Sequence, residues 1–167
     1  MSFTLVLGGA RSGKSRHAEQ LIEAHAAPWT YIATAQAWDD EMRERIKLHR
    51  ARRPPGWTTV DAPIALPDAL RAADHGQAIL VDCLTLWLTN VMLSEADVAA
   101  ACADLLAACG AVASPLVLVS SEVGFGIVPD NALARRFRDE LGTLNQALAR
   151  AAAHVVLTVA GLPLKVK

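Results

Sequence analysis

Charge of one sign, paired cysteines and long apolar runs are all scarce in this sequence. Its 16 basic and 17 acidic residues leave a net charge of -1, so no overall field draws the protein to nucleic acid or to an anionic membrane. The three cysteines include no C-x-x-C pair, which favours a reducing compartment over a disulfide framework. The N-terminus lacks the basic start and apolar core of a signal peptide, and Gly110 and Pro115 interrupt the uncharged stretch 105–121. We therefore expect a cytoplasmic protein with no membrane insertion and no nucleic acid partner.

What the sequence does contain is a high apolar content, 53% of residues, arranged as short runs between helical patterns. Apolar runs predict buried strands at 3–7, 29–33, 78–81, 116–120 and 155–159, with shorter strands at 57–60 and 162–166. Helical spacing predicts helices at 15–26, 39–53, 66–73, 84–93, 95–109 and 131–153. Strands that alternate with helices are typical of an α/β fold with an open, mostly parallel sheet flanked by helices. We expect one domain over residues 1–167.

The most specific motif follows the first predicted strand and opens the first predicted helix. It fits G-x-x-x-x-G-K-[ST] at every fixed position and consists of Gly8, Gly9, Ala10, Arg11, Ser12, Gly13, Lys14 and Ser15. Glycines let the backbone approach phosphate oxygens closely, and the loop amides with the positive end of the helix then hold the anion. We expect Lys14 to reach the β- and γ-phosphates of ATP or GTP, and the Ser15 hydroxyl to bind Mg²⁺. The motif predicts a P-loop NTPase.

A P-loop enzyme also needs a distant acidic residue that fixes the metal. Asp82 ends the apolar run 78–81, where a parallel strand would deliver its carboxylate to the same edge of the sheet as the P-loop. Asp82 could equally act as the N-cap of the next helix, and the two roles are compatible. We expect Mg²⁺ to be held by Ser15 and Asp82.

A basic helical segment is the second informative feature. Arg45, His49, Arg52 and Arg53 lie at i, i+4, i+7 and i+8, so they share one helical face. A solvated basic face is the ordinary meaning of such a pattern. A chemical meaning is also available, because neighbouring cations disfavour the imidazolium form and so keep a histidine neutral and nucleophilic. The arginines could neutralise a triphosphate under attack.

With these segments in view, nearly the whole chain resembles the adenosylcobinamide kinase / adenosylcobinamide-phosphate guanylyltransferase family. The resemblance rests on motifs that occur in the family's order: the P-loop followed by Arg16, Ile32 to Thr34, Asp39 to Met42, Arg45 to Arg50 with Arg53-Pro54, Glu122 to Pro129, Asn131 to Asn145, and Gly161 to Lys165. Together these motifs are far more specific than the P-loop alone.

The resemblance implies a role for each matching position. His49 takes the place of the histidine that becomes covalently guanylylated. Nucleotide contacts are implied for Ala33, Thr34, Ala35, Arg50, Ala51, Arg52, Arg53, Asp61 and Asp82. The family further implies a RecA-like sheet, a homotrimer, and the substrates GTP, ATP, adenosylcobinamide and adenosylcobinamide phosphate. Either one nucleotide site serves both steps or each step has its own.

Two other classes of function are compatible with the P-loop. One is a small-molecule kinase with a single activity, in which the basic helix merely binds phosphates. The other is a nucleotide-dependent switch or a RecA-like motor on nucleic acid. The near-zero net charge and the lack of a basic tail argue against the motor. A covalent guanylyl adduct would distinguish the bifunctional enzyme from both.

Overall fold

The computed structural model describes residues 3–36, 40, 43–44, 47, 51, 53–73 and 76–167. Its strands are β1 (Phe3–Gly8), β2 (Trp29–Ala33), β3 (Trp57–Asp61), β4 (Ala78–Asp82), β5 (Leu116–Ser121), β6 (His154–Val159) and β7 (Leu162–Lys165). Its helices are α1 (Lys14–Glu23), α3 (Leu66–Ala72), α4 (Leu84–Leu93), α5 (Val98–Ala111) and α6 (Ala132–Ala151). All seven predicted strands are therefore present.

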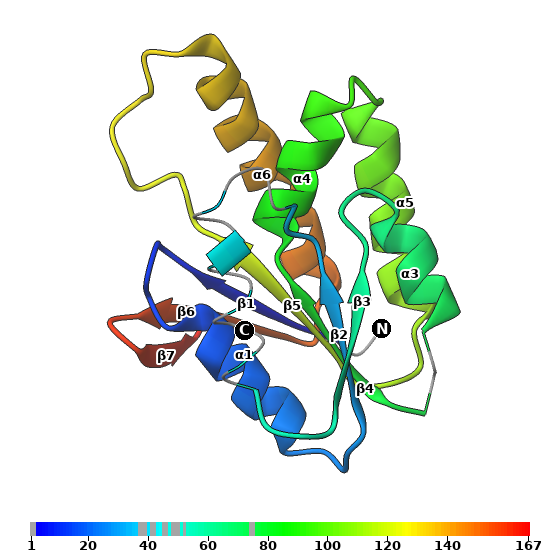
Figure 1. Ribbon diagram of the computed structural model, residues 1–167. Coiled ribbons are helices and arrows are strands. Elements are labelled where there is room, and N and C mark those ends of the chain that lie inside the picture. Colours follow the sequence, from blue (N-terminus) through cyan, green and yellow to red (C-terminus); the bar gives the residue numbers. More distant parts are fainter. Residues whose placement is uncertain are drawn as a thin grey trace.

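The strands form one sheet in the order β3-β2-β4-β5-β1-β6-β7, in which every pair is parallel except β6 with β7 (Figure 1). β5 lies between the strand that leads into the P-loop and the strand that ends at Asp82. The predicted open and mostly parallel sheet is confirmed. All six parallel strands end at the same edge, so the residues that follow them meet there.

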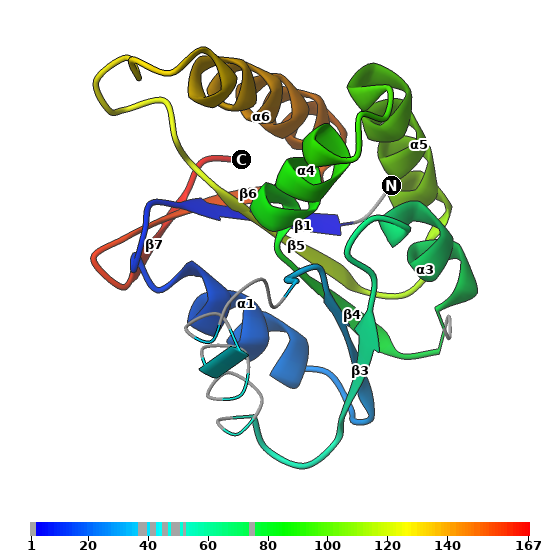
Figure 2. The same cartoon turned by 45° about the horizontal axis from the view of Figure 1, so that its top comes forward.

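Helices cover both faces of the sheet, with α1 on one face and α4, α5 and α6 on the other (Figure 2). The period of two along each strand sets this arrangement, since successive side chains point to opposite faces. In β1, Phe3 and Leu5 pack in the cluster formed by α3 to α6, whereas Val6 packs with Ala18 and Ile22 of α1. Each strand of the central sheet is thus apolar on both faces, as a doubly covered parallel sheet requires.

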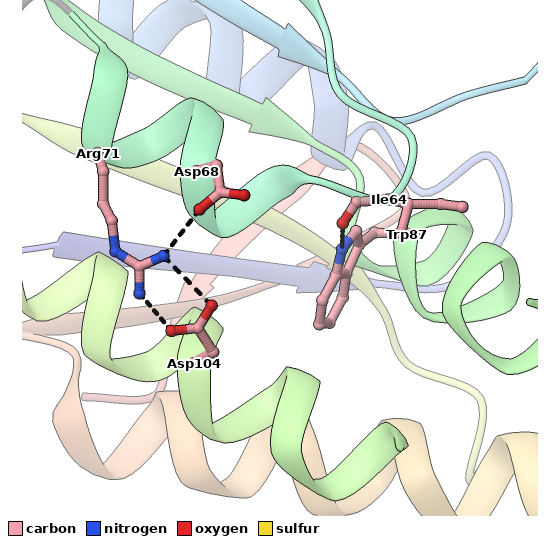
Figure 3. A network of polar contacts seen from close by, with 5 residues as sticks. All are labelled: Ile64, Asp68, Arg71, Trp87 and Asp104. Carbon is pink, nitrogen blue, oxygen red and sulfur yellow. Dashed lines mark hydrogen bonds and ion pairs between the residues drawn. The ribbon is translucent and has the colours of Figure 1, made fainter. Parts of the chain in front are cut away.

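Side chains outside the sheet fix the segment between β3 and α3. The Trp87 indole N–H donates to the Ile64 carbonyl at 2.9 Å, and Trp87 itself is fully buried (Figure 3). Nearby, Arg71 of α3 pairs with Asp68 and Asp104, and its hydrogen bond to Asp104 raises the pKa of the guanidinium and lowers that of the carboxyl. This ion pair is exposed and contributes little stability, whereas the buried indole helps to hold the 62–65 segment in place.

Several helix ends differ from those expected. The helix predicted at 95–109 begins only at Val98, because Glu95 has a positive φ of 59° and the Asp97 carboxylate accepts from the Ala100 N–H as an N-cap. The helix predicted at 15–26 runs from Lys14 to Glu23. Most of the helix predicted at 39–53 lies outside the described residues. Among the described helices, none is both long enough and apolar enough to cross a membrane.

Candidate nucleotide-binding site

The P-loop motif lies between the end of β1 and the start of α1. Arg11 and Gly13 take left-handed backbone conformations, with φ of 53° and 92°, and these turn the chain from the strand into the helix. A Cβ on Gly8 would collide with the Ser12 side chain and would lie 2.8 Å from the Thr158 carbonyl oxygen. The loop therefore needs glycine at this position for close packing and at Gly13 for its backbone angle.

Two polar groups of the loop indicate a cradle for an anion. The Lys14 ammonium donates to the Gly9 carbonyl at 3.1 Å, so the side chain folds back over the loop. The Ser12 hydroxyl oxygen is buried and has no hydrogen-bond partner among the described residues. Buried polar groups normally have partners, and a phosphate held by the loop amides would bring oxygens within reach of both groups.

The turn between β6 and β7 packs against the P-loop. The Gly161 N–H donates to the Ser12 carbonyl at 2.9 Å, and a Cβ on Gly13 would lie only 3.1 Å from the Gly161 Cα. The antiparallel strand β7 therefore contributes to the site, because its pairing with β6 holds this turn against the P-loop.

The three predicted contacts Ala33, Asp61 and Asp82 lie side by side at the carboxyl edge of the sheet. Ala33 at the end of β2 pairs in register with Asp61 of β3 and with Asp82 of β4. Asp82 and Asp61 are level in register with Val6 of β1, so with strands about 4.8 Å apart they lie about 10 Å and about 19 Å from that residue, and β1 continues to Gly8. Asp82 can therefore share a metal ion with a phosphate on the P-loop, whereas Asp61 is too distant to contact that phosphate.

Asp82 is held by a residue that the sequence pattern did not reveal. The Tyr31 hydroxyl of β2 donates to the Asp82 carboxylate at 3.1 Å. Burial, and next the charge of Asp82, raise the pKa of Tyr31 far above its usual range, so the hydroxyl keeps its proton and remains a donor. The Arg53 guanidinium lies 3.7 Å from the centre of the Tyr31 ring and donates to the Thr59 hydroxyl at 3.3 Å. Because Tyr31 lies two residues before Ala33 in the same strand, the alternation of side chains could have predicted that both lie on one face of the sheet.

The side chain of Thr34 connects the ends of β2 and β4. Its hydroxyl donates to the Cys83 carbonyl at 2.7 Å and accepts from the Cys83 N–H at 2.8 Å, and the side chain is fully buried. Burial raises the pKa of the Cys83 thiol to about 11, so that thiol stays protonated and unreactive at neutral pH. Thr34 thus positions the edge, and its predicted nucleotide contact stays a prediction.

Asn90, in the middle of the apolar helix α4, is a second positioning residue that sequence reasoning missed. It is buried, and its amide donates to the Thr34 and Pro63 carbonyls at 2.9 Å each. These two bonds join the segments that follow β2 and β3. A lone amide in a run of leucines is the signal that could have identified it, because buried polar side chains nearly always have partners.

The basic segment is described only in part. The predicted nucleophile His49 and the predicted contacts Arg50 and Arg52 lie outside the described residues. Ala51 is helical and exposed, and Arg53 lies on Tyr31. At its described end, the segment therefore reaches β2 and β3, next to the acidic edge of the sheet.

Two hollows flank the carboxyl edge. One, of about 470 Å³, is lined by the 61–65 segment and by α3 residues that include Asp68 and Ala72. The other, of about 610 Å³, is lined by P-loop residues 9–12, by residues of the 122–126 segment and by residues 157–160 of β6 and the turn after it. The carboxyl edge thus has one recess beside the P-loop and another at its β3 end.

Solved structures of similar shape share the fold. A KaiC-like protein of Pyrococcus horikoshii superposes with a TM-score of 0.50 at 12% identity, covering 93% of this chain and 70% of that one. An ATPase of a bacterial type III secretion system gives 0.54 at 12% identity, covering 98% and 56%. These likenesses concern the fold, and they confirm the predicted P-loop NTPase architecture of the RecA-like kind.

Relatives by sequence are much closer. Residues 4–166 match the family described as cobinamide kinase / cobinamide phosphate guanyltransferase. The bifunctional adenosylcobalamin biosynthesis protein CobP of Pseudomonas aeruginosa is 49% identical over 98% of this chain and 96% of its own length. The corresponding protein CobU of Salmonella typhimurium is 47% identical over 98% of both chains. With its phosphate cradle, its acidic edge and this match over almost its full length, the chain belongs to the cobinamide kinase / cobinamide phosphate guanyltransferase family.

Proposed function

We propose that this protein is a bifunctional transferase of cobalamin biosynthesis. It phosphorylates adenosylcobinamide with ATP or GTP, and it then transfers GMP from GTP to adenosylcobinamide phosphate, which gives adenosylcobinamide-GDP. The observation that carries the proposal is the P-loop with Lys14 at one end of a shared sheet edge and Asp82 two strands away, in a chain of this family.

In the kinase step, the hydroxyl oxygen of the aminopropanol arm attacks the γ-phosphorus. The bond to the β–γ bridging oxygen breaks, the nucleoside diphosphate leaves, and the hydroxyl proton is released. Lys14 and the loop amides stabilise the charge on the transferring group, and they need no covalent chemistry to do so. The unpartnered Ser12 hydroxyl is a further donor within the loop.

The residues present suit Mg²⁺. A hydroxyl at Ser15 and a carboxylate at Asp82 are hard oxygen ligands, and Mg²⁺ in phosphoryl-transfer sites commonly takes one or two protein oxygens together with phosphates and water. Asp82 is already oriented by Tyr31. When bound, the ion would neutralise charge between the β- and γ-phosphates.

Removal of the Tyr31 hydroxyl should weaken this metal site. Tyr31→Phe keeps the ring under Arg53 but deletes the hydrogen bond to Asp82. Loss of an outer partner of a metal ligand typically lowers metal affinity at least about tenfold. We expect a comparable rise in the Mg²⁺ concentration needed for half-maximal kinase activity, and weaker Mn²⁺ binding by electron paramagnetic resonance with GTP present. Thr59→Val, which removes only the Arg53 contact, is the matched control. Unchanged Mn²⁺ binding in Tyr31→Phe would contradict this role.

In the guanylyl step, a nitrogen of the His49 imidazole attacks the α-phosphorus of GTP. The bond to the α–β bridging oxygen breaks and pyrophosphate leaves. An oxygen of adenosylcobinamide phosphate then attacks the phosphorus of the guanylyl-histidine, the P–N bond breaks, and the imidazole is released. The covalent relay divides one difficult transfer into two easier ones. Arg50, Arg52 and Arg53 supply positive charge for the triphosphate, in line with the position of Arg53 beside the acidic edge.

The spacing of the sheet supports two nucleotide positions rather than one. Four strand spacings, about 19 Å, separate Asp61 from Val6 on the strand that leads into the P-loop. Asp61 lines the apolar hollow of about 470 Å³ and pairs in register with Ala33, and Arg53 at the described end of the basic segment contacts the same two strands. We infer that the GTP attacked by His49 lies toward this side, while the kinase nucleotide occupies the P-loop.

The function is tested by following both products in one assay. Protein incubated with adenosylcobinamide and Mg²⁺-GTP should form adenosylcobinamide phosphate and then adenosylcobinamide-GDP, separated by chromatography. With GTP labelled at the α-phosphate, denatured protein should carry acid-labile, alkali-stable label, as a phosphoramidate does. A single-activity kinase would make the phosphate and take up no label. A nucleotide switch would make neither product.

Two finer proposals accompany this function. The enzyme works in the cytoplasm, in line with its three free cysteines and the lack of any C-x-x-C pair. It assembles as a homotrimer, a state that the family resemblance implies. Exposed apolar residues on the edge strand β7, Leu162 and Leu164, support an oligomer because such residues commonly mark contacts between proteins. Light scattering would give the mass.

A further inference from the structure

The segment between β5 and α6 is held firmly at both ends. At its start, the Glu122 carboxylate accepts from the Gly124 N–H at 2.7 Å and from the Phe125 N–H at 3.3 Å. At its end, the Arg135 guanidinium donates to the Pro129 and Asp130 carbonyls at 2.9 and 2.7 Å. Figure 1 shows this yellow segment projecting from the sheet above the P-loop. Hydrogen bonds from Glu122 and Arg135 therefore fix the conformation of the segment.

The fixed segment presents apolar side chains to solvent. Phe125 is 86% exposed and Ile127 is 97% exposed, and Val128 and Leu133 beside them are more than half exposed. Side chains of this size rarely gather on a surface without a binding partner. Because Glu122 and Arg135 hold the ends of the segment, it presents these side chains without needing a partner to order it.

The same segment forms one wall of the hollow of about 610 Å³ beside the P-loop. P-loop residues 9–12 line this hollow, whereas Lys14 and Ser15 do not. The Glu122 N–H donates to the Gly8 carbonyl at 3.0 Å, which joins this wall to the base of the loop. The hollow thus adjoins the phosphate cradle from outside. Arg11 and Glu122 are its only charged lining residues within the described part of the chain, so it does not resemble a phosphate site.

The direction of phosphoryl transfer decides what the hollow can hold. In the proposed kinase step the phosphates would be held at the N-terminus of α1, which covers one face of the sheet. The attacking and leaving oxygens are roughly in line, so the acceptor must arrive from the opposite side. The 122–130 segment starts beside the base of the loop and leads to α6, on the face of the sheet opposite α1, and Val123 packs against the core there.

We propose that this hollow and its apolar rim, formed by Phe125, Ile127, Val128 and Leu133, are the acceptor site of the kinase step. The inference rests on the proposed function and names the place where its substrate binds. A hollow of this volume is within the range of about 300–1,000 Å³ usual for small-molecule sites, so it takes the hydroxyl-bearing arm. The macrocycle is too large to enter and lies with an apolar surface on the exposed rim.

The double variant Phe125→Ser and Ile127→Ser tests the rim. Loss of apolar contact at one such side chain weakens binding about tenfold or more. We expect the KM for adenosylcobinamide to rise at least about tenfold, with the KM for ATP changed less than about twofold. Equilibrium dialysis of adenosylcobinamide, followed by its own colour, should show the same loss without turnover. Leu93→Ser, an exposed leucine at the end of α4, is the matched control.

The possible results distinguish failure of the proposed acceptor site from failure of the proposed function. If the wild type phosphorylates adenosylcobinamide and the double variant keeps its acceptor KM and binding, the rim is not the acceptor site. A variant that keeps its acceptor KM but changes its mass in light scattering would assign the rim to a contact between copies of the chain, which also overturns the inference. If the wild type phosphorylates no adenosylcobinamide, the proposed function fails and the inference fails with it.

Discussion

His49→Ala should lose guanylyl transfer while retaining phosphoryl transfer. Transfer of a phosphoryl group to a hydroxyl needs positioning and charge neutralisation, and Lys14 and the loop amides supply both without an imidazole. Guanylyl transfer by the covalent route needs the nucleophile itself. Its removal should lower formation of adenosylcobinamide-GDP by a factor on the order of 10³ to 10⁶, the scale on which loss of a catalytic nucleophile acts. The variant should also take up no label from GTP labelled at the α-phosphate.

The control variants make this result specific. His49→Asn keeps a polar side chain among the neighbouring arginines and should behave like His49→Ala. His25→Ala alters an exposed histidine just after α1 and should retain both activities. If folded His49→Ala loses both activities, the two steps share one site and the two-position arrangement is wrong. If it retains both, another group is the nucleophile and the basic segment is a solvated face.

Lys14→Ala should strongly reduce the use of triphosphate at the P-loop and leave the fold intact. Within the described part of the chain, the Lys14 ammonium donates to the Gly9 carbonyl, and its side chain belongs to neither core cluster. In the transition state it would face the charge on the transferring group, where removal of one such donor costs about 10²- to 10³-fold in rate. The kinase step should fall by that factor, with formation of adenosylcobinamide phosphate measured at saturating acceptor.

Binding gives a second measurement for Lys14. At a nucleotide concentration of 100 times Kd, the wild type should gain about 2.7 kcal/mol, which for a chain of this size raises Tm by about 5–10 °C. The Lys14→Ala protein should melt at the wild-type temperature without nucleotide and gain far less with it. Lys165→Ala, at an exposed position on β7, should show the wild-type gain. An equal rise in Tm for Lys14→Ala with nucleotide would show that Lys14 does not bind the triphosphate.

Much of the fold could be predicted because its signals are local. The run Ala78 to Val81 and the glycine-rich turn after Leu7 each identify a buried strand that ends at a ligand edge. The order of the strands could not be predicted. That β5 lies between β1 and β4 depends on how apolar faces of similar composition pack, and several arrangements satisfy the same period.

The site was predictable where one motif carries the chemistry, and less so where distant segments meet. The P-loop is contiguous, so Gly8 to Ser15 follow from the sequence. Tyr31 reaches Asp82 only because β2 and β4 are neighbours, and no spacing along the chain encodes that contact. The apolar rim at Phe125 and Ile127 was visible in the sequence as a glycine-rich segment, but its exposure and its place beside the P-loop required the fold.

The position of β5 between β1 and β4 also determines which substitutions leave the geometry of the catalytic edge unchanged. Asp82 is two strand spacings from Val6, on the strand that leads into the phosphate cradle, and backbone hydrogen bonds set this separation at about 10 Å. Side chains of β5 such as Leu118 and Val119 pack against the helices and do not define that separation. Core residues of β5 can therefore be replaced by apolar residues of similar volume without a change in the spacing between β1 and β4.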